Sequence, residues 1–161
     1  MSRPKRILLV DDSDNDVQLI QLALSKRSGN HEVTVAHDGV DAVDFLWRRG
    51  PYEARLGTDP DVILLDLKMP RKNGFDVLSW WRVQHNLGAI RIVVLTTSEA
   101  IRDINEAYKL GAASFLVKPL NFNEFRTTIF AMYDFWRNNL RGEASREEKS
   151  AEPDGNGAGS R

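Results

Sequence analysis

The sequence predicts an α/β fold in which five parallel strands form one doubly wound sheet flanked by five helices. Short apolar runs alternate five times with stretches of helical periodicity, which is typical of βαβ units. The run at residues 62–65 is apolar at every position, as expected for a strand covered by helices on both faces. Right-handed crossovers make the doubly wound arrangement the default for such a chain. Its 161 residues are enough for one domain with a substantial core.

The first two strands are short apolar runs, and each is followed by a segment with helical periodicity. The strands are expected at residues 6–10 and 33–36. Apolar residues at helical spacing begin at Val17 after the first strand and at Val40 after the second. Gly50-Pro51 ends the second helix, and a polar loop leads from there to the third strand.

The remaining three units repeat this alternation. The third strand, at residues 61–66, ends on a carboxylate, and a turn-rich loop then opens a helix. The fourth strand, at 90–95, precedes a helix that Gly111 ends, because glycine tolerates the left-handed conformation. The fifth strand, at 114–117, precedes a long last helix expected at about 121–141.

Composition narrows the classes of function and the extent of the domain. The chain has 22 basic and 23 acidic residues, which argues against a broad surface for nucleic acid. It has no cysteine, so disulfides, thiolate zinc sites and a cysteine nucleophile are excluded. No stretch approaches the roughly 20 consecutive apolar residues of a membrane span. We therefore expect a cytoplasmic protein with its domain at residues 1–141, followed by a disordered tail at 142–161 that is charged and then rich in small residues.

Polar residues suited to phosphoryl chemistry follow four of the five predicted strands. They are the acidic run 11–16, Asp66, Thr96 and Lys118, and the carboxyl ends of parallel strands meet at one edge of a sheet. Carboxylates gathered there repel one another unless a cation joins them, and oxygen ligands suit Mg²⁺. A carboxylate beside a metal can accept a phosphoryl group. Lys118 and the hydroxyl of Thr96 would then contact the phosphoryl oxygens.

These residues resemble the receiver domain of bacterial response regulators, a flavodoxin-like fold. The motifs are Val10-Asp11-Asp12, Leu65-Asp66-Leu-Lys-Met-Pro70, Gly74, Leu95-Thr96, Gly111-Ala112 and Val117-Lys118-Pro119. The resemblance implies that Asp66 accepts a phosphoryl group from a histidine kinase, in a protein that is not an enzyme beyond slow loss of its own phosphate. It also implies a Mg²⁺ site made by Asp11, Asp12, Asp66 and the backbone carbonyl of Lys68.

The same resemblance assigns the residues that respond to phosphorylation. Thr96 would be the switch hydroxyl, although a slip of one residue would give that role to Thr97. Phe115 would be the aromatic residue that turns inward with it, and Lys118 would bind the phosphate. A cis peptide is implied before Pro119. More narrowly, the sequence of residues 64–70 and 95–98 is similar to that of single-domain regulators paired with bacterial phytochromes. This similarity implies a phytochrome-type kinase in a phosphorelay.

The last predicted helix is longer than the sheet needs. About 20 residues of helix span about 30 Å, whereas typical strands span about 17–20 Å. Its apolar arc is wider than one sheet face can cover, and exposed apolar surface marks an interaction site. We therefore predict a homodimer built on this helix, with an interface formed by Phe130, Tyr133, Phe135, Trp136 and Leu140.

Three other functions fit part of the sequence. Asp12-Ser-Asp14 resembles the nucleophile motif of metal-dependent phosphohydrolases, but this leaves Asp66 unexplained, and Asp16 stands where such enzymes usually have Thr or Val. A flavodoxin-like cofactor binder would need a Ser-, Thr- or Gly-rich phosphate loop after the first strand, where this chain has acids. A receiver-shaped interaction module that is never phosphorylated would not need the full set of site residues.

Overall fold

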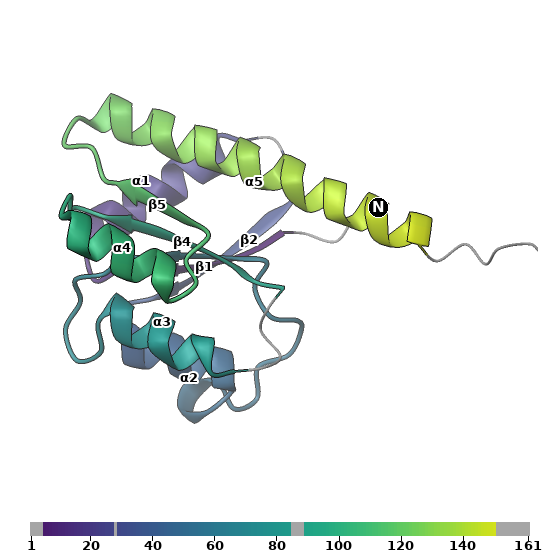
Figure 1. Ribbon diagram of the computed structural model, residues 1–161, viewed down its shortest axis with the longest axis horizontal. Coiled ribbons are helices and arrows are strands. Elements are labelled where there is room, and N and C mark those ends of the chain that lie inside the picture. The colour runs from purple at the N-terminus through teal and green to yellow at the C-terminus, as the bar shows by residue number, and fades with distance from the viewer. Residues whose placement is uncertain (1–4, 28, 85–88, 151–161) are drawn as a thin grey trace, which may run out of the picture.

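The chain forms one five-stranded parallel sheet between two layers of helices (Figure 1). The computed structural model describes residues 5–27, 29–84 and 89–150, and for 139–150 it describes the backbone alone. The strands are β1 (Lys5–Val10), β2 (His31–Ala36), β3 (Val62–Leu65), β4 (Arg91–Thr96) and β5 (Ser114–Val117). Their order, β2-β1-β3-β4-β5, is that of flavodoxin-like folds and confirms the predicted fold class.

The helices divide between the two faces of the sheet. Figure 1 shows α1 and α5 over one face, with α2, α3 and α4 on the other. Their bounds are α1 (Asp14–Ser25), α2 (Gly39–Trp47), α3 (Gly74–Arg82), α4 (Ile101–Lys109) and α5 (Phe122–Ser150). The predicted polar loop after α2 contains a single 3₁₀ turn, η1 (Gly50–Tyr52). No helix in these parts of the chain is both long and apolar enough to cross a bilayer.

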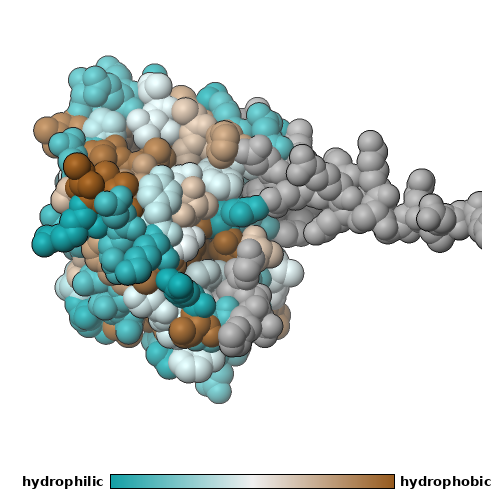
Figure 2. Space-filling view, viewed as in Figure 1, coloured by the Kyte–Doolittle hydropathy of each residue, from teal (hydrophilic) through white to brown (hydrophobic). Residues whose placement is uncertain are grey.

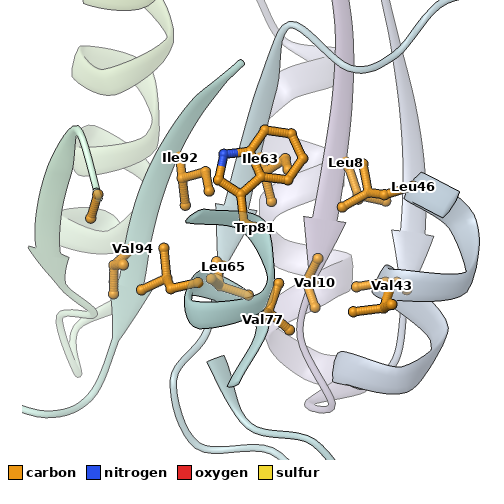
Figure 3. Packing of buried hydrophobic residues seen from close by; sticks show 14 of the residues in the cluster. Leu8, Val10, Val43, Leu46, Ile63, Leu65, Val77, Trp81, Ile92 and Val94 are labelled. Atoms are coloured by element: carbon orange, nitrogen blue, oxygen red, sulfur yellow. The ribbon is translucent and has the colours of Figure 1, made fainter. Parts of the chain in front are cut away.

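Alternate strand positions supply two separate hydrophobic cores, because successive side chains of a strand point to opposite faces. Figure 3 shows the core under α2 and α3, where Leu8, Val10, Ile63, Leu65, Ile92 and Val94 pack with Val43, Leu46, Val77 and Trp81. On the other face, Ile7, Leu9, Val62, Leu64, Val93 and Leu95 pack with residues of α1 and α5. Every residue of β3 is buried, as its uninterrupted apolar run predicts.

The last helix continues farther than the sequence indicated. It runs to Ser150, so residues 142–150, which we expected in a disordered tail, are helical. The reason is local, because this segment is rich in Glu, Ala, Arg and Lys, all strong helix formers, and a helix already nucleated at Phe122 needs only to be extended. Residues 151–161 of the expected tail lie outside the described residues.

Candidate functional site

The site lies at the carboxyl edge of the sheet, where three backbone hydrogen bonds continue the ladder past the strand ends. The amide of Asp11 donates to Ala36 O (3.1 Å), that of Asp66 to Val10 O (2.9 Å) and that of Lys118 to Thr96 O (2.7 Å). These bonds fix the backbone of each functional residue against a neighbouring strand. Asp11, Asp66, Thr96 and Lys118 are all buried. Residues up to 107 positions apart are thus brought together, as the topology predicts.

The Lys118 ammonium is the centre of the charge cluster. Its Nζ lies 2.6 Å from Asp11 Oδ2, 2.9 Å from Asp16 Oδ2 and 3.4 Å from Asp66 Oδ2. An ammonium has three donors, so these three carboxylates satisfy it completely. Burial lowers the pKa of Lys118, but its hydrogen bonds with Asp11 and Asp16 outweigh burial and hold the pKa above its ordinary value. The lysine therefore stays charged.

Among the carboxylates of the cluster, Asp11 has a raised pKa. Burial raises the pKa of Asp11 to about 6, although Lys118 and the Ser13 amide both donate hydrogen bonds to it. Ligand oxygens of Asp11, Asp12 and Asp66 lie within 4.8 Å of one another. Asp12 is exposed, so the cluster opens to solvent on that side. Three converging carboxylates with room for water fit a divalent metal ion of the hard, oxygen-binding kind.

Thr96 places a hydroxyl in this site without a partner for it. Its side chain is fully buried at the end of β4. Among the side chains described, its Oγ1 is one of two buried polar atoms that have no hydrogen-bond partner. A buried unpaired hydroxyl is unfavourable by about 1–3 kcal/mol, so it is available to an incoming acceptor such as a phosphoryl oxygen. Thr97, the alternative from the sequence, is exposed.

The sequence also made predictions for Lys68, Phe115 and Pro119, which lie next to these residues. The amide of Lys68 donates to Asp66 Oδ1 at 3.4 Å, and its side chain is exposed. The metal contact expected of its backbone carbonyl stays a prediction. Phe115 is partly buried against the core, and its amide donates to the hydroxyl of Tyr108 on α4 (3.1 Å). The cis peptide expected before Pro119 is wrong, because no peptide bond in the described residues is cis. Trans is the lower-energy form of an X–Pro bond by about 0.5–1 kcal/mol.

The predicted dimer residues separate into two groups. Tyr133 is buried against the ring of His31, and Phe130 lies beneath the Arg27 guanidinium, so both stabilise the contact of α5 within its own domain. On that side the helix packs against α1 and the α1–β2 connection. The assignment of Phe130 and Tyr133 to a subunit interface stays a prediction. Trp136 is half-buried and Phe135 is 56% exposed. The side chain of Leu140 lies outside the described residues.

Sequence reasoning missed the role of Asp16. It appeared as one acid in a run and as a departure from the phosphohydrolase motif, yet it is the second-nearest partner of Lys118. A signal was available, because side chains of a helix tilt toward its N-terminus and Asp16 lies in the first turn of α1. An acid at that position points back at the sheet edge. Asp14, in the same turn, is 84% exposed and lies 4.0 Å from His37 instead.

A flavodoxin-like sheet with converging carboxylates, a buried hydroxyl and a charged lysine at its carboxyl edge is the arrangement expected of a receiver domain. The chain belongs to the response regulator receiver domain family, whose model matches residues 7–130. As a member of that family it is a two-component signalling protein and not an enzyme.

Three relatives show the similarity in more detail. Response regulator Rcp1 of Synechocystis sp. is 37% identical over 133 residues, which cover 83% of this chain and 89% of Rcp1. The crystal structure of its Mn²⁺-bound form has a TM-score of 0.78 and covers 83% of this chain and 94% of that one. The phosphorylated cyanobacterial phytochrome response regulator RcpA is 34% identical, with a TM-score of 0.80 and coverage of 84% and 96%. The bacteriophytochrome response regulator AtBRR is 41% identical, with a TM-score of 0.67 and coverage of 80% and 91%.

Proposed function

We propose that this protein is a phosphoacceptor in which Asp66 receives a phosphoryl group from a histidine kinase. The observation that carries the proposal is the geometry of one buried cluster, in which a charged lysine contacts Asp66 beside an unpaired threonine hydroxyl. The crystallised relative RcpA is phosphorylated, which supports the same chemistry here. Asp14 faces solvent and His37, so the geometry does not favour the phosphohydrolase alternative based on Asp12 and Asp14.

In the proposed transfer, an Oδ atom of Asp66 attacks the phosphorus of a phosphohistidine. The new O–P bond forms as the P–N bond breaks, and the electron pair of that bond returns to the imidazole nitrogen. Lys118 neutralises the transferred oxygens, and Thr96 donates its hydroxyl to one of them. Mg²⁺, held by Asp11, Asp12, Asp66 and the carbonyl of Lys68, would supply further positive charge. The Mn²⁺-bound form of Rcp1 supports a divalent ion at this place.

The phosphorylated state would differ from the resting state along β4 and β5. Once Thr96 bonds the phosphoryl group, the end of β4 shifts toward Asp66 and Phe115 on the neighbouring strand follows it inward. Phe115 is linked to α4 through the hydroxyl of Tyr108, so α4 belongs to the same responding face.

Intact mass after incubation with Mg²⁺ and acetyl phosphate tests the proposal. We expect wild type to gain one phosphoryl group and the Asp66→Asn variant to gain none. Phosphorylation of both proteins would place the acceptor elsewhere. A wild-type protein that gains nothing, with or without metal, would instead support the unphosphorylated interaction module.

We further propose a phytochrome-type kinase as the phosphodonor, acting in the cytoplasm with neither nucleic acid nor membrane as a partner. The names of RcpA and AtBRR tie two similar proteins to phytochromes. Exposed apolar side chains gather beside the site, where β5 passes into α5 and α4 begins (Figure 2). Leu120 is fully exposed there, and Ile101 is 74% exposed. Such a patch suits a protein partner that must bring its phosphohistidine to Asp66.

We also propose that two copies of the chain associate through the outer side of α5. Phe135 and Trp136 border a groove with Met132 and with Leu116 of the edge strand β5. The helix extends well past the sheet in Figure 1, which gives a second copy additional surface to contact.

A further inference from the structure

Asp16 makes a contact that the metal-binding and phosphate-binding roles of the site do not explain. Its Oδ2 lies 2.9 Å from Lys118 Nζ, which is closer than the acceptor Asp66 at 3.4 Å. It is oriented by its place in the first turn of α1, where its amide donates to Ser13 Oγ (3.3 Å). Its side chain is 28% exposed, whereas that of Lys118 is 5% exposed.

Lys118 and a divalent ion would share two carboxylates. The carboxylates of Asp11 and Asp66 are two of the three that converge on the metal cluster, and both also contact Lys118. A buried ammonium that loses its carboxylate partners is strongly destabilised, and it also repels a nearby cation. A metal ion on Asp11 and Asp66 would therefore weaken two of the three contacts of the ammonium, and a partner that is not a metal ligand would then hold it in place. Of the described acids that contact Lys118, Asp16 alone lies outside the metal cluster.

We propose that Asp16 is a positioning residue that holds the Lys118 ammonium when a divalent metal ion occupies Asp11 and Asp66. This inference rests on the metal site of the proposed function. Asp16 acts through Lys118 and does not itself contact the metal. It keeps the ammonium adjacent to the acceptor, where the phosphoryl oxygens would arrive.

The first measurement is the dissociation constant of Mg²⁺, by calorimetry on the full chain, for wild type, Asp16→Asn and Asp14→Asn. We expect Asp16→Asn to weaken Mg²⁺ binding about tenfold, which is the usual loss of affinity when a residue that supports a metal site without binding the metal is replaced. Asp14→Asn is the matched control, because it removes the same charge from the same helical turn without touching Lys118. It should change the constant less than twofold, and equal effects of the two variants would overturn the inference.

A double-mutant cycle separates action through the lysine from direct attraction of the metal. In a Lys118→Met background there is no ammonium to hold, so Asp16→Asn should change Mg²⁺ affinity less than twofold. A tenfold effect that persists there would show that Asp16 acts on the metal by charge alone and would overturn the proposal. Asp16→Glu retains a carboxylate and should recover most of the affinity.

A spectroscopic measurement provides the same test without the Lys118 variant. With Mg²⁺ at saturation, the Lys118 ammonium protons of wild type should stay protected from exchange with water, as observed by ¹⁵N NMR. The Asp16→Asn variant should lose this protection, while Asp14→Asn keeps it. Loss of this protection in wild type as well would overturn the inference. Wild type that binds no Mg²⁺ would refute the proposed metal site together with it, whereas normal binding with no effect of Asp16→Asn would refute the inference alone.

Discussion

Thr96 illustrates a conflict between stability and function within a single side chain. Its hydroxyl is fully buried and has no hydrogen-bond partner. Under the proposed function it would gain a partner when a phosphoryl group arrives. Thr96→Val replaces the hydroxyl with a methyl group of similar size. We expect the free energy of unfolding of the unphosphorylated protein to rise by about 1 kcal/mol, because an unsatisfied buried donor is removed. Urea denaturation measures this change.

Thr97→Val is the control for this prediction, since Thr97 is exposed and its replacement should leave the free energy of unfolding nearly unchanged. A Thr96→Val protein that is less stable than wild type would show that the hydroxyl has a partner in the resting state. The same variant should also weaken the coupling between phosphorylation and β5, because it cannot donate to the phosphoryl oxygen.

The loop that follows the acceptor is tied to the β2–α2 loop by one ion pair. Arg71 Nε donates to Asp38 Oδ2 at 2.7 Å, and Asp38 also accepts from the Asp41 amide at 2.8 Å. Burial acts to raise the pKa of Asp38, but these hydrogen bonds outweigh it and hold that pKa below its usual range. A carboxyl group with a lowered folded-state pKa stabilises the protein above its unfolded pKa of about 3.9. That stabilisation is lost as the pH falls through the folded-state value.

We therefore expect Arg71→Gln to lower the free energy of unfolding by about 1 kcal/mol or less at pH 7, since the arginine is largely exposed. The difference from wild type should shrink as the pH falls below the unfolded pKa of about 3.9 and then through the lower folded-state pKa of Asp38. Denaturation curves at pH 7 and pH 3 give the two differences. A difference independent of pH would mean that Arg71 acts through packing rather than through its charge.

At the scale of elements, glycine permits the close approach of the same two loops. The Gly39 amide donates to Lys72 O at 3.0 Å, and a Cβ on Gly39 would lie only 2.1 Å from that oxygen. Gly39→Ala must push the acceptor loop away, so we expect it to lower the free energy of unfolding by about 3 kcal/mol. Phosphorylation by acetyl phosphate should also slow, because the displaced loop starts at Asp66.

Gly50→Ala provides the comparison for Gly39→Ala. Gly50 has a φ of 57° but no atom within 3.4 Å of an added Cβ, so only its left-handed backbone disfavours alanine, by about 1 kcal/mol. Thermal or urea unfolding of both variants decides the point. If the two substitutions lower the free energy of unfolding equally, the contact between the β2–α2 loop and the acceptor loop is not tight.

The elements that the sequence predicted well are those with strong local signals. Alternating apolar runs placed the strands within a few residues. The strand ends bring Lys118 into contact with Asp66 through its ammonium and with Thr96 through its backbone amide. The end of α5 was misplaced because composition alone does not separate a charged helix from a charged coil. The burial of Tyr133 depends on its contact with His31, more than 100 residues away, which no local pattern reports.

At the scale of the whole molecule, the patch beside the site should affect phosphoryl transfer from the kinase but not from acetyl phosphate. Leu120→Glu places a charge on a fully exposed residue and leaves the buried cluster intact. We expect unchanged phosphorylation by acetyl phosphate and at least fivefold slower transfer from an autophosphorylated phytochrome kinase. Leu56→Glu, at a residue 91% exposed in the loop after α2, is the control and should slow neither reaction. Equal slowing by both donors would place the defect in the acceptor site.

Exposed aromatic residues on α5 allow a test of the proposed dimer. Phe135 is 56% exposed beside the groove along β5, and Phe122, in the first turn of the same helix, is 46% exposed. The two residues share chemistry and exposure but lie at different ends of the domain. If the groove is the dimer contact, Phe135→Glu should shift the chain to a monomer, because an unpaired charge in an apolar interface is strongly unfavourable. Phe122→Glu should leave the dimer intact.

Light scattering at high micromolar concentration measures this for wild type and for both variants. A wild-type chain that is monomeric at that concentration rules out the dimer. A dimer that survives Phe135→Glu but dissociates with Phe122→Glu would move the contact to the site end of α5. In that case the subunit interface would overlap the patch around Leu120, and the kinase would have to displace one copy of the protein in order to phosphorylate the other.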